Sequence, residues 1–239
     1  MLKETVSEIK SEFKNLKSEA VIALIYCAIV LTCMDYFFIP PRAEALLQGL
    51  GMGQWVEPTM RAGLIWSLSC LIGFLFIPCC LLWLQKKSVR DYGFSSRGFF
   101  SHISIYLGLF ALMLPLIYLA AQEPHFRDTY PFIPQAKLTW RLFLVWEIAY
   151  VLQFFCLEFF FRGFLLFTLE KHMQKFIAIA VMIVPYVMIH FHKPIFETFG
   201  AVVAGLVLGF LSLRYRSWLG GAVLHGMVAV TLDLLATYG

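Results

Sequence analysis

The chain has 239 residues, of which 60% are hydrophobic and only 14% are charged, and its formal net charge is +4. An ordinary soluble domain is about 45–50% apolar and about 25% charged, so this composition argues against a water-soluble globule. The small net charge and the scattered basic residues argue against a nucleic-acid-binding surface. We therefore predict an all-α, polytopic transmembrane helical bundle whose partners include the lipid bilayer and no nucleic acid.

The first 18 residues predict an amphipathic helix. Apolar residues recur there at steps of three and four, at Leu2, Val6, Ile9, Phe13 and Leu16. The first 19 residues also hold four Lys and four Glu, and that acidic content is atypical of a cleavable signal peptide. Residues 1–18 are thus expected to lie on the membrane surface, and a partner-binding helix is the alternative.

Apolar runs of the length that crosses a bilayer follow this helix. A span needs about 20 apolar residues, and seven runs are candidates: 19–39, 63–84, 101–121, 139–168, 174–191, 199–213 and 218–236. The run 199–213 is short for a full crossing, and counts of six or eight are alternatives. With seven spans, twelve basic residues fall on one side and six on the other. This bias predicts a cytoplasmic N-terminus in the inner (cytoplasmic) membrane.

Six ionisable residues lie at predicted membrane depth, where each costs about 2.5–3.5 kcal/mol on insertion scales. They gather in the last four runs, and the first three carry little beyond Asp35 near a run's end. This asymmetry predicts a polar chamber in the C-terminal half, with residues 19–138 as supporting spans. The six are Glu147, Glu158, Arg162, His190, His225 and Asp233.

The spacing of these residues suggests both ordinary and functional roles. Glu158 and Arg162 are four apart, so a simple ion pair on one helix face is the plainest interpretation. Glu147 precedes Glu158 by eleven residues, which directs both carboxylates nearly the same way. The alternative for Glu147 is a solvated position at the outer interface, beside Trp140 and Trp146.

Glutamate and histidine together supply what the activation of water requires. A buried carboxylate accepts a proton from water, one imidazole orients the water, and a second can stabilise an oxyanion. The same donor set would suit zinc, so spacing alone leaves a metal site open. Hydrolysis is the favoured chemistry, and proton or ion translocation and structural polar packing remain alternatives. Neither Gly-x-Ser-x-Gly nor His-Glu-x-x-His occurs in the chain, so those motifs give no support to a serine or zinc-helix mechanism.

Three short motifs resemble those of a known family. Residues 157–163, Leu-Glu-Phe-Phe-Phe-Arg-Gly, resemble its motif Glu-Glu-x-x-x-Arg. Tyr186 and His190 resemble its Phe-x-x-x-His, and His225 begins a segment similar to its His-x-x-x-Asn. The three motifs occur in the family's order on successive apolar runs. Residues 140–236 therefore resemble the CPBP family of CAAX proteases and bacteriocin-processing enzymes. This family is also called Abi and comprises intramembrane glutamate proteases.

The resemblance implies an intramembrane endopeptidase that cleaves a membrane-associated protein or peptide, with residues 139–239 as its catalytic core. By matching positions, Glu158 is the expected general base, His190 orients the water, and His225 holds the oxyanion. The resemblance favours a mechanism without a bound cofactor or metal, although zinc stays open. The expected supporting residues are Arg162, Asp233, as an orienting partner of His225, and Glu147.

Two positions depart from the family pattern. Leu157 replaces the first glutamate of the first motif, and Ala229 replaces the asparagine of the third. A shift of one residue rotates a side chain by about 100° around a helix, so Glu158 is not a trivial substitute. A non-catalytic relative, such as an immunity or scaffolding factor, is therefore the alternative function.

Overall fold

A computed structural model describes residues 1–15, 19–50, 58–123, 126–191 and 193–239. In these ranges the regular structure is helical and holds no strand, so the predicted all-α fold is confirmed. The predicted N-terminal helix is present as α1, Leu2–Asn15, and residues 16–18 of that prediction lie outside the described residues. The remaining α-helices are α2 (Glu19–Cys33), α3 (Pro40–Gly49), α4 (Pro58–Cys70), α5 (Ile77–Leu84), α6 (Ser96–Phe100), α7 (Ile103–Ala120), α8 (Phe126–Thr129), α9 (Trp140–Glu158), α10 (Leu166–Glu170), α11 (Lys175–Met188), α12 (Ile195–Tyr215) and α13 (Leu219–Tyr238). Two short 3₁₀ segments complete the connections: η3 (Val89–Tyr92) and η4 (Pro134–Leu138).

Among the described residues, six continuous helices are long and apolar enough to cross a membrane. They are Glu19–Phe38, Thr59–Leu84, Ile103–Ala120, Trp140–Glu170, Ile195–Tyr215 and Leu219–Tyr238. The predicted run 174–191 is instead the 14-residue helix α11. The expectation that 199–213 is short was wrong, because α12 begins directly after Pro194 and extends over 21 residues. A proline fits a helix start because the first helical turn needs no N–H from it.

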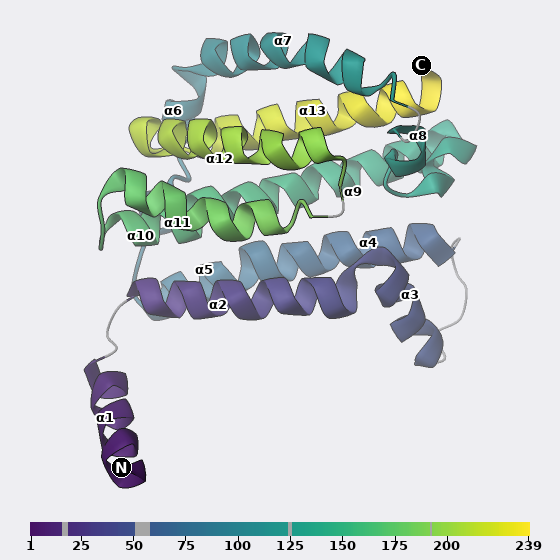
Figure 1. Cartoon of the computed structure of the whole chain (residues 1–239). Coiled ribbons are helices and arrows are strands. Elements are labelled where there is room, and N and C mark those ends of the chain that lie inside the picture. The colour runs from purple at the N-terminus through teal and green to yellow at the C-terminus, as the bar shows by residue number, and fades with distance from the viewer. Residues whose placement is uncertain (16–18, 51–57, 124–125, 192) are drawn as a thin grey trace.

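The long helices run roughly side by side, with α9 in the middle of the bundle, while α1 stands apart from it (Figure 1). On one side α9 packs against α4, and on the other it packs against α13. Beyond α13 lies α7, while α11 and α12 pack against each other. The long helix from α9 to α10 is thus enclosed by its neighbours, which explains how it accommodates charged side chains.

The largest apolar core surrounds the second half of this central helix. Phe159, Phe160, Phe161 and Phe164 are all buried there, and Tyr26 of α2 meets Phe160 and Phe164 edge to ring. Aromatic rings bury much apolar area and favour such edge contacts. The N-terminal helices therefore act as packing support for the polar C-terminal half.

Three of the long helices contain π-helical turns: η1 (Met34–Phe38), η2 (Leu71–Phe76) and η5 (Phe159–Leu165). Segment η2 ends two residues before Pro78, whose ring would clash with the carbonyl four residues earlier in a regular helix. A widened turn relieves that clash and lets the helix continue. Segment η5 starts directly after Glu158 and contains Arg162, so the widened turn lies at the buried ion pair. Turns of this kind are frequent at functional sites.

The contact between α7 and α13 requires glycine at position 220. A Cβ atom added to Gly220 would lie 2.1 Å from Cε2 of the buried Tyr106 ring. Gly220→Ala should therefore destabilise the protein by about 1–3 kcal/mol through overpacking. Thermal unfolding in detergent measures the loss. The control is Gly108→Ala on α7, where an added Cβ meets nothing within 4 Å, and an equal loss in both variants would contradict the prediction.

Candidate functional site

Glu158 and Arg162 form a fully buried ion pair at the end of α9. Nη1 of Arg162 donates to Oε1 of Glu158 across 2.5 Å, and neither side chain is exposed. The Arg162 guanidinium also lies 4.2 Å from the centre of the Tyr186 ring, which adds a cation–π contact. The ion pair expected from the spacing is therefore present, and its carboxylate has a further partner.

That further partner is His225 of α13. Its Nδ1 lies 3.0 Å from the same Oε1 atom of Glu158. Because an ionised carboxylate only accepts hydrogen bonds, Nδ1 carries the hydrogen and Nε2 is left with a free lone pair. The His225 ring packs against Phe154, with ring centres 4.2 Å apart. Glu158 and His190 are buried, whereas the side chain of His225 is 17% exposed.

His190 lies close to this pair, in the turn after α11. Its Nδ1 is 2.9 Å from the carbonyl oxygen of Tyr186, so Nδ1 donates and Nε2 is again free. Thr198 of α12 donates its hydroxyl to the carbonyl of His190, which ties the turn to the next helix. The rings of His190 and His225 are nearly parallel, at 16°, with centres 6.5 Å apart. Glu158, His190 and His225, far apart in the sequence, are therefore neighbours in space.

Glu147 and Asp233 lie apart from that cluster, at a second contact between α9 and α13. Asp233 Oδ2 accepts a hydrogen bond from Nε1 of Trp146 at 2.8 Å. Asp233 therefore does not orient His225, because a separation of eight residues turns it about 80° away around α13. Glu147 is buried beside Asp233, so the alternative of a solvated position at the interface was wrong. Both Glu147 and Glu158 face α13, as their spacing predicted.

The two positions that depart from the family pattern are both buried in apolar surroundings. Leu157 belongs to the large core around η5, and Ala229 belongs to a second core cluster that includes Tyr150 and Phe154. Neither side chain can donate or accept a hydrogen bond. The polar groups of the site are thus confined to Glu158, His190, His225 and Arg162.

Sequence reasoning did not identify Gly221, which permits the approach of α9 to α13 at the site. A Cβ atom at this position would lie 2.9 Å from Oε2 of Glu158. The paired glycines 220 and 221 inside an apolar helix were the available signal, since such glycines often mark close packing. The role of Phe154 against His225 had no signal in the sequence.

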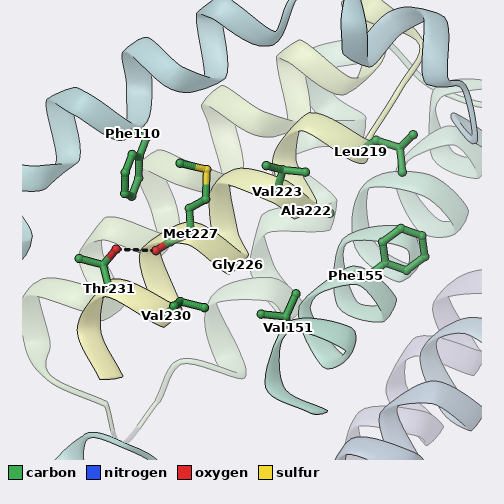
Figure 2. A pocket seen from close by; sticks show the side chains of 10 residues that line it. All are labelled: Phe110, Val151, Phe155, Leu219, Ala222, Val223, Gly226, Met227, Val230 and Thr231. Carbon is green, nitrogen blue, oxygen red and sulfur yellow. Dashed lines mark hydrogen bonds between the residues drawn. The ribbon is translucent and has the colours of Figure 1, made fainter. Parts of the chain in front are cut away.

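An apolar cavity of about 460 Å³ lies between α7, α9 and α13 (Figure 2). Phe155 of α9 and Phe110 of α7 face it, and Ala222 and Gly226 line it on α13. Ala222 precedes His225 by three residues and Gly226 follows it directly, so the cavity adjoins the helix segment that carries His225. Its lining is almost entirely apolar.

No group of three His, Cys, Asp or Glu side chains in the described part of the chain is arranged to hold a metal ion. The arrangement consists of hydrogen bonds and ion pairs, and its atoms without a hydrogen-bond partner include Oε2 of Glu158 and Nε and Nη2 of Arg162. The Nε2 nitrogens of His190 and His225 also keep a free lone pair. Such nitrogens can accept a proton from water or hold a water molecule in place.

These observations define the class: an integral membrane protein of packed helices with a carboxylate, two imidazoles and a guanidinium buried together at its centre. Residues 139–231 match the family described as "Rce1-like: Type II CAAX prenyl endopeptidase Rce1-like". The match agrees with the family resemblance found in the motifs, and over these residues the chain is similar to the CAAX protease family. Searches of curated proteins and of solved structures found no match.

The matched segment contains all four polar residues of the site. It runs from the residue before α9 to the second half of α13 and includes Glu158, Arg162, His190 and His225. The match to this family supports, in general terms, a function as a CAAX-type intramembrane protease.

Proposed function

We propose that the protein is an intramembrane endopeptidase that hydrolyses a peptide bond with a water molecule activated between His225 and His190. The observation that carries the proposal is the hydrogen bond from His225 Nδ1 to Glu158 Oε1, with His190 beside it. A carboxylate that holds one imidazole nitrogen fixes the tautomer and stabilises the imidazolium that forms during proton transfer. The other nitrogen of His225, Nε2, is then the general base.

This division of roles differs from the one expected from the motifs, where Glu158 is the base. Oε1 of Glu158 already accepts from both Arg162 and His225, and its side chain is fully buried. Water therefore reaches the more exposed His225 more easily than it reaches Glu158. We assign Glu158 to the orientation of His225, and Arg162 to the charge balance of Glu158.

The proposed reaction moves one proton through His225. Nε2 of His225 takes a proton from water while the water oxygen attacks the carbonyl carbon, and the free Nε2 of His190 accepts the water's other hydrogen bond. The protonated His225 then donates to the oxyanion and gives its proton to the leaving amide nitrogen as the C–N bond breaks. This assignment does not need a donor at position 229, where the chain has alanine.

The substrate proposed is a membrane-associated protein or peptide with an apolar part. The cavity between α7, α9 and α13 is lined by residues of the α13 segment that carries His225, although not by His225 itself, and it offers an apolar surface for that part. Ligand sites commonly combine an apolar cavity with a few well-placed polar groups. We further propose that the N-terminus is cytoplasmic and that the protein resides in the cytoplasmic (inner) membrane, as the distribution of basic residues indicates.

The test is cleavage of a prenylated CAAX-type peptide by the protein in liposomes. Wild type should cleave it, and His225→Ala should lose about 10²–10⁴-fold in kcat/KM, the usual contribution of a general base. His190→Ala should lose activity as well. His172→Ala is the control, because His172 is exposed in the turn before α11. Full activity of His225→Ala at normal expression would refute the proposal.

A second candidate function is a non-catalytic member of the family, and Leu157 and Ala229 favour it. These are the two positions where the family pattern has polar groups and this chain has apolar ones. In this case the biological role would survive His225→Ala and would fail when a partner-facing surface is changed. A complementation assay with the same variants separates the two functions.

The alternative of a proton or ion pathway predicts transport activity. The purified protein alone, reconstituted in liposomes, would then carry protons or ions across the membrane. Absence of any flux would remove this alternative.

A further inference from the structure

Glu147 and Asp233 form a second buried polar contact between the two helices that carry Glu158 and His225. Glu147 is 6% exposed and Asp233 is fully buried. Trp146, the residue before Glu147, donates to Asp233 at 2.8 Å, so the two carboxyl groups lie at the same contact between the helices. Both residues occupy spanning helices, α9 and α13. The site described above does not use either of them.

The hydrogen bonds of this pair are incomplete as long as both groups are ionised. Asp233 Oδ2 accepts a hydrogen bond from Trp146. Among the described residues, the other oxygen of Asp233 and both oxygens of Glu147 have no donor. Two ionised carboxylates only accept, so they cannot bond to each other. Adjacent buried carboxylates also repel, and one of them then retains a proton. A single proton on Glu147 would give it a donor to Asp233.

With one shared proton, the pair of Glu147 and Asp233 carries a single negative charge, and nearby basic residues stabilise a charge of that sign. Lys193 and Lys137 act electrostatically on Asp233, and they attract that charge. Lys193 is already paired with Glu197 at 2.7 Å, and Tyr130 donates to the same carboxylate. Tyr150 lies on α9 within electrostatic reach of both members of the pair. The titratable and charged groups that act on the pair are thus Lys137, Lys193, Tyr130 and Tyr150. Glu197 binds Lys193 and Tyr130.

The pair also lies in register with the candidate site. Along α9, Glu147 precedes Glu158 by eleven residues, and along the antiparallel α13, Asp233 follows His225 by eight. The two contacts therefore join the same helices about two to three turns apart. Repulsion at one of them would separate the helices and weaken the other.

We propose that Glu147 and Asp233 share one proton and thereby hold α9 against α13 in the arrangement that brings Glu158 to His225. The two are positioning residues, and this inference rests on the proposed function only where it concerns catalysis. When the proton leaves at high pH, the carboxylates repel, the stability falls, and the alignment of Glu158 with His225 is lost. A glutamine at position 147 donates an amide hydrogen to Asp233 and needs no proton.

The experiment compares wild type with Glu147→Gln, Glu147→Ala and the exposed control Glu123→Gln. Infrared spectroscopy of the purified protein at neutral pH reports the C=O stretch of a protonated carboxylic acid. Thermal unfolding in nanodiscs is measured over a range of pH, and cleavage of the prenylated peptide gives the pH profile of kcat/KM. The infrared and unfolding measurements do not depend on activity.

The proposal expects the protonated-acid band in wild type and Glu123→Gln and its loss in Glu147→Gln. The stability of wild type should fall at high pH, whereas that of Glu147→Gln should not, and Glu147→Ala should be less stable than both. In the pH profile, Glu147→Gln should keep at high pH the activity that wild type loses. A missing band in wild type, a band that persists in Glu147→Gln, or equal alkaline sensitivity of the two would overturn the proposal. If no variant cleaves the peptide, the proposed function fails while the band still tests the shared proton.

Discussion

Arg162→Met is expected to destabilise the protein by about 3–5 kcal/mol, because it leaves the carboxylate of Glu158 buried without its main counter-charge. The ion pair is fully buried, and Arg162 also packs on Tyr186. His225 alone can compensate Glu158 only by becoming protonated. Thermal or denaturant unfolding in detergent measures the loss.

The matched control for this prediction is the double variant Glu158→Leu/Arg162→Met. Replacement of a whole buried ion pair by apolar residues is often neutral or stabilising, so the double variant should regain most of the stability lost in Arg162→Met. It should remain inactive, because His225 then lacks its orienting carboxylate. A double variant that is as unstable as Arg162→Met would show that the pair matters mainly for the fold.

The second large effect concerns activity. Gly221→Ala places a methyl group 2.9 Å from Oε2 of Glu158, whose other oxygen is fixed by Arg162 and His225. The carboxylate must shift, and a shift of about 1 Å in a catalytic arrangement can cost about 10²-fold in rate. We expect that loss in kcat/KM for the prenylated peptide.

Gly200→Ala on α12 serves as the control. An added Cβ at position 200 meets nothing within 4 Å. This variant should keep nearly full activity, and both variants should fold. Equal activities of the two would contradict the close approach of Glu158 to α13.

The part of the site that depends on a single helix was predictable from the sequence. A separation of four residues places Glu158 and Arg162 on one face, and eleven residues direct Glu147 and Glu158 the same way. Both expectations agree with the structure. Periodicity within one element is enough for such statements, because helix geometry is nearly constant.

Contacts between helices were not predictable in the same way. The sequence suggested that Glu147 lies at an interface next to two tryptophans, but Trp146 turns inward to bind Asp233, while Trp140 is exposed. The partner of Asp233 depends on how α13 is rotated against α9, which a single sequence does not contain. For the same reason the sequence predicted only that Glu158 and His225 lie near each other. The structure shows which atoms meet, Nδ1 of His225 and Oε1 of Glu158.

The fold class followed from composition, whereas the number of full-length helices did not. Hydropathy marked the runs 174–191 and 199–213 but misjudged which one is short. The reason is local: α11 ends at Met188, and Pro194 starts α12 earlier than its apolar run begins. Lys193 and Glu197 lower the mean hydropathy around the start of this helix. Glu197 nevertheless lies in the first turn of α12, and Lys193 lies just before it.

The central claim, that Glu158 acts through His225, is tested most directly by a double-mutant cycle on peptide cleavage. The values of kcat/KM are measured for wild type, Glu158→Gln, His225→Ala and the variant with both changes, each checked for folding. Residues that act as one unit show strongly non-additive losses. The account predicts that the double variant is no slower than His225→Ala alone. Losses that multiply in the double variant would show two independent roles and would contradict it.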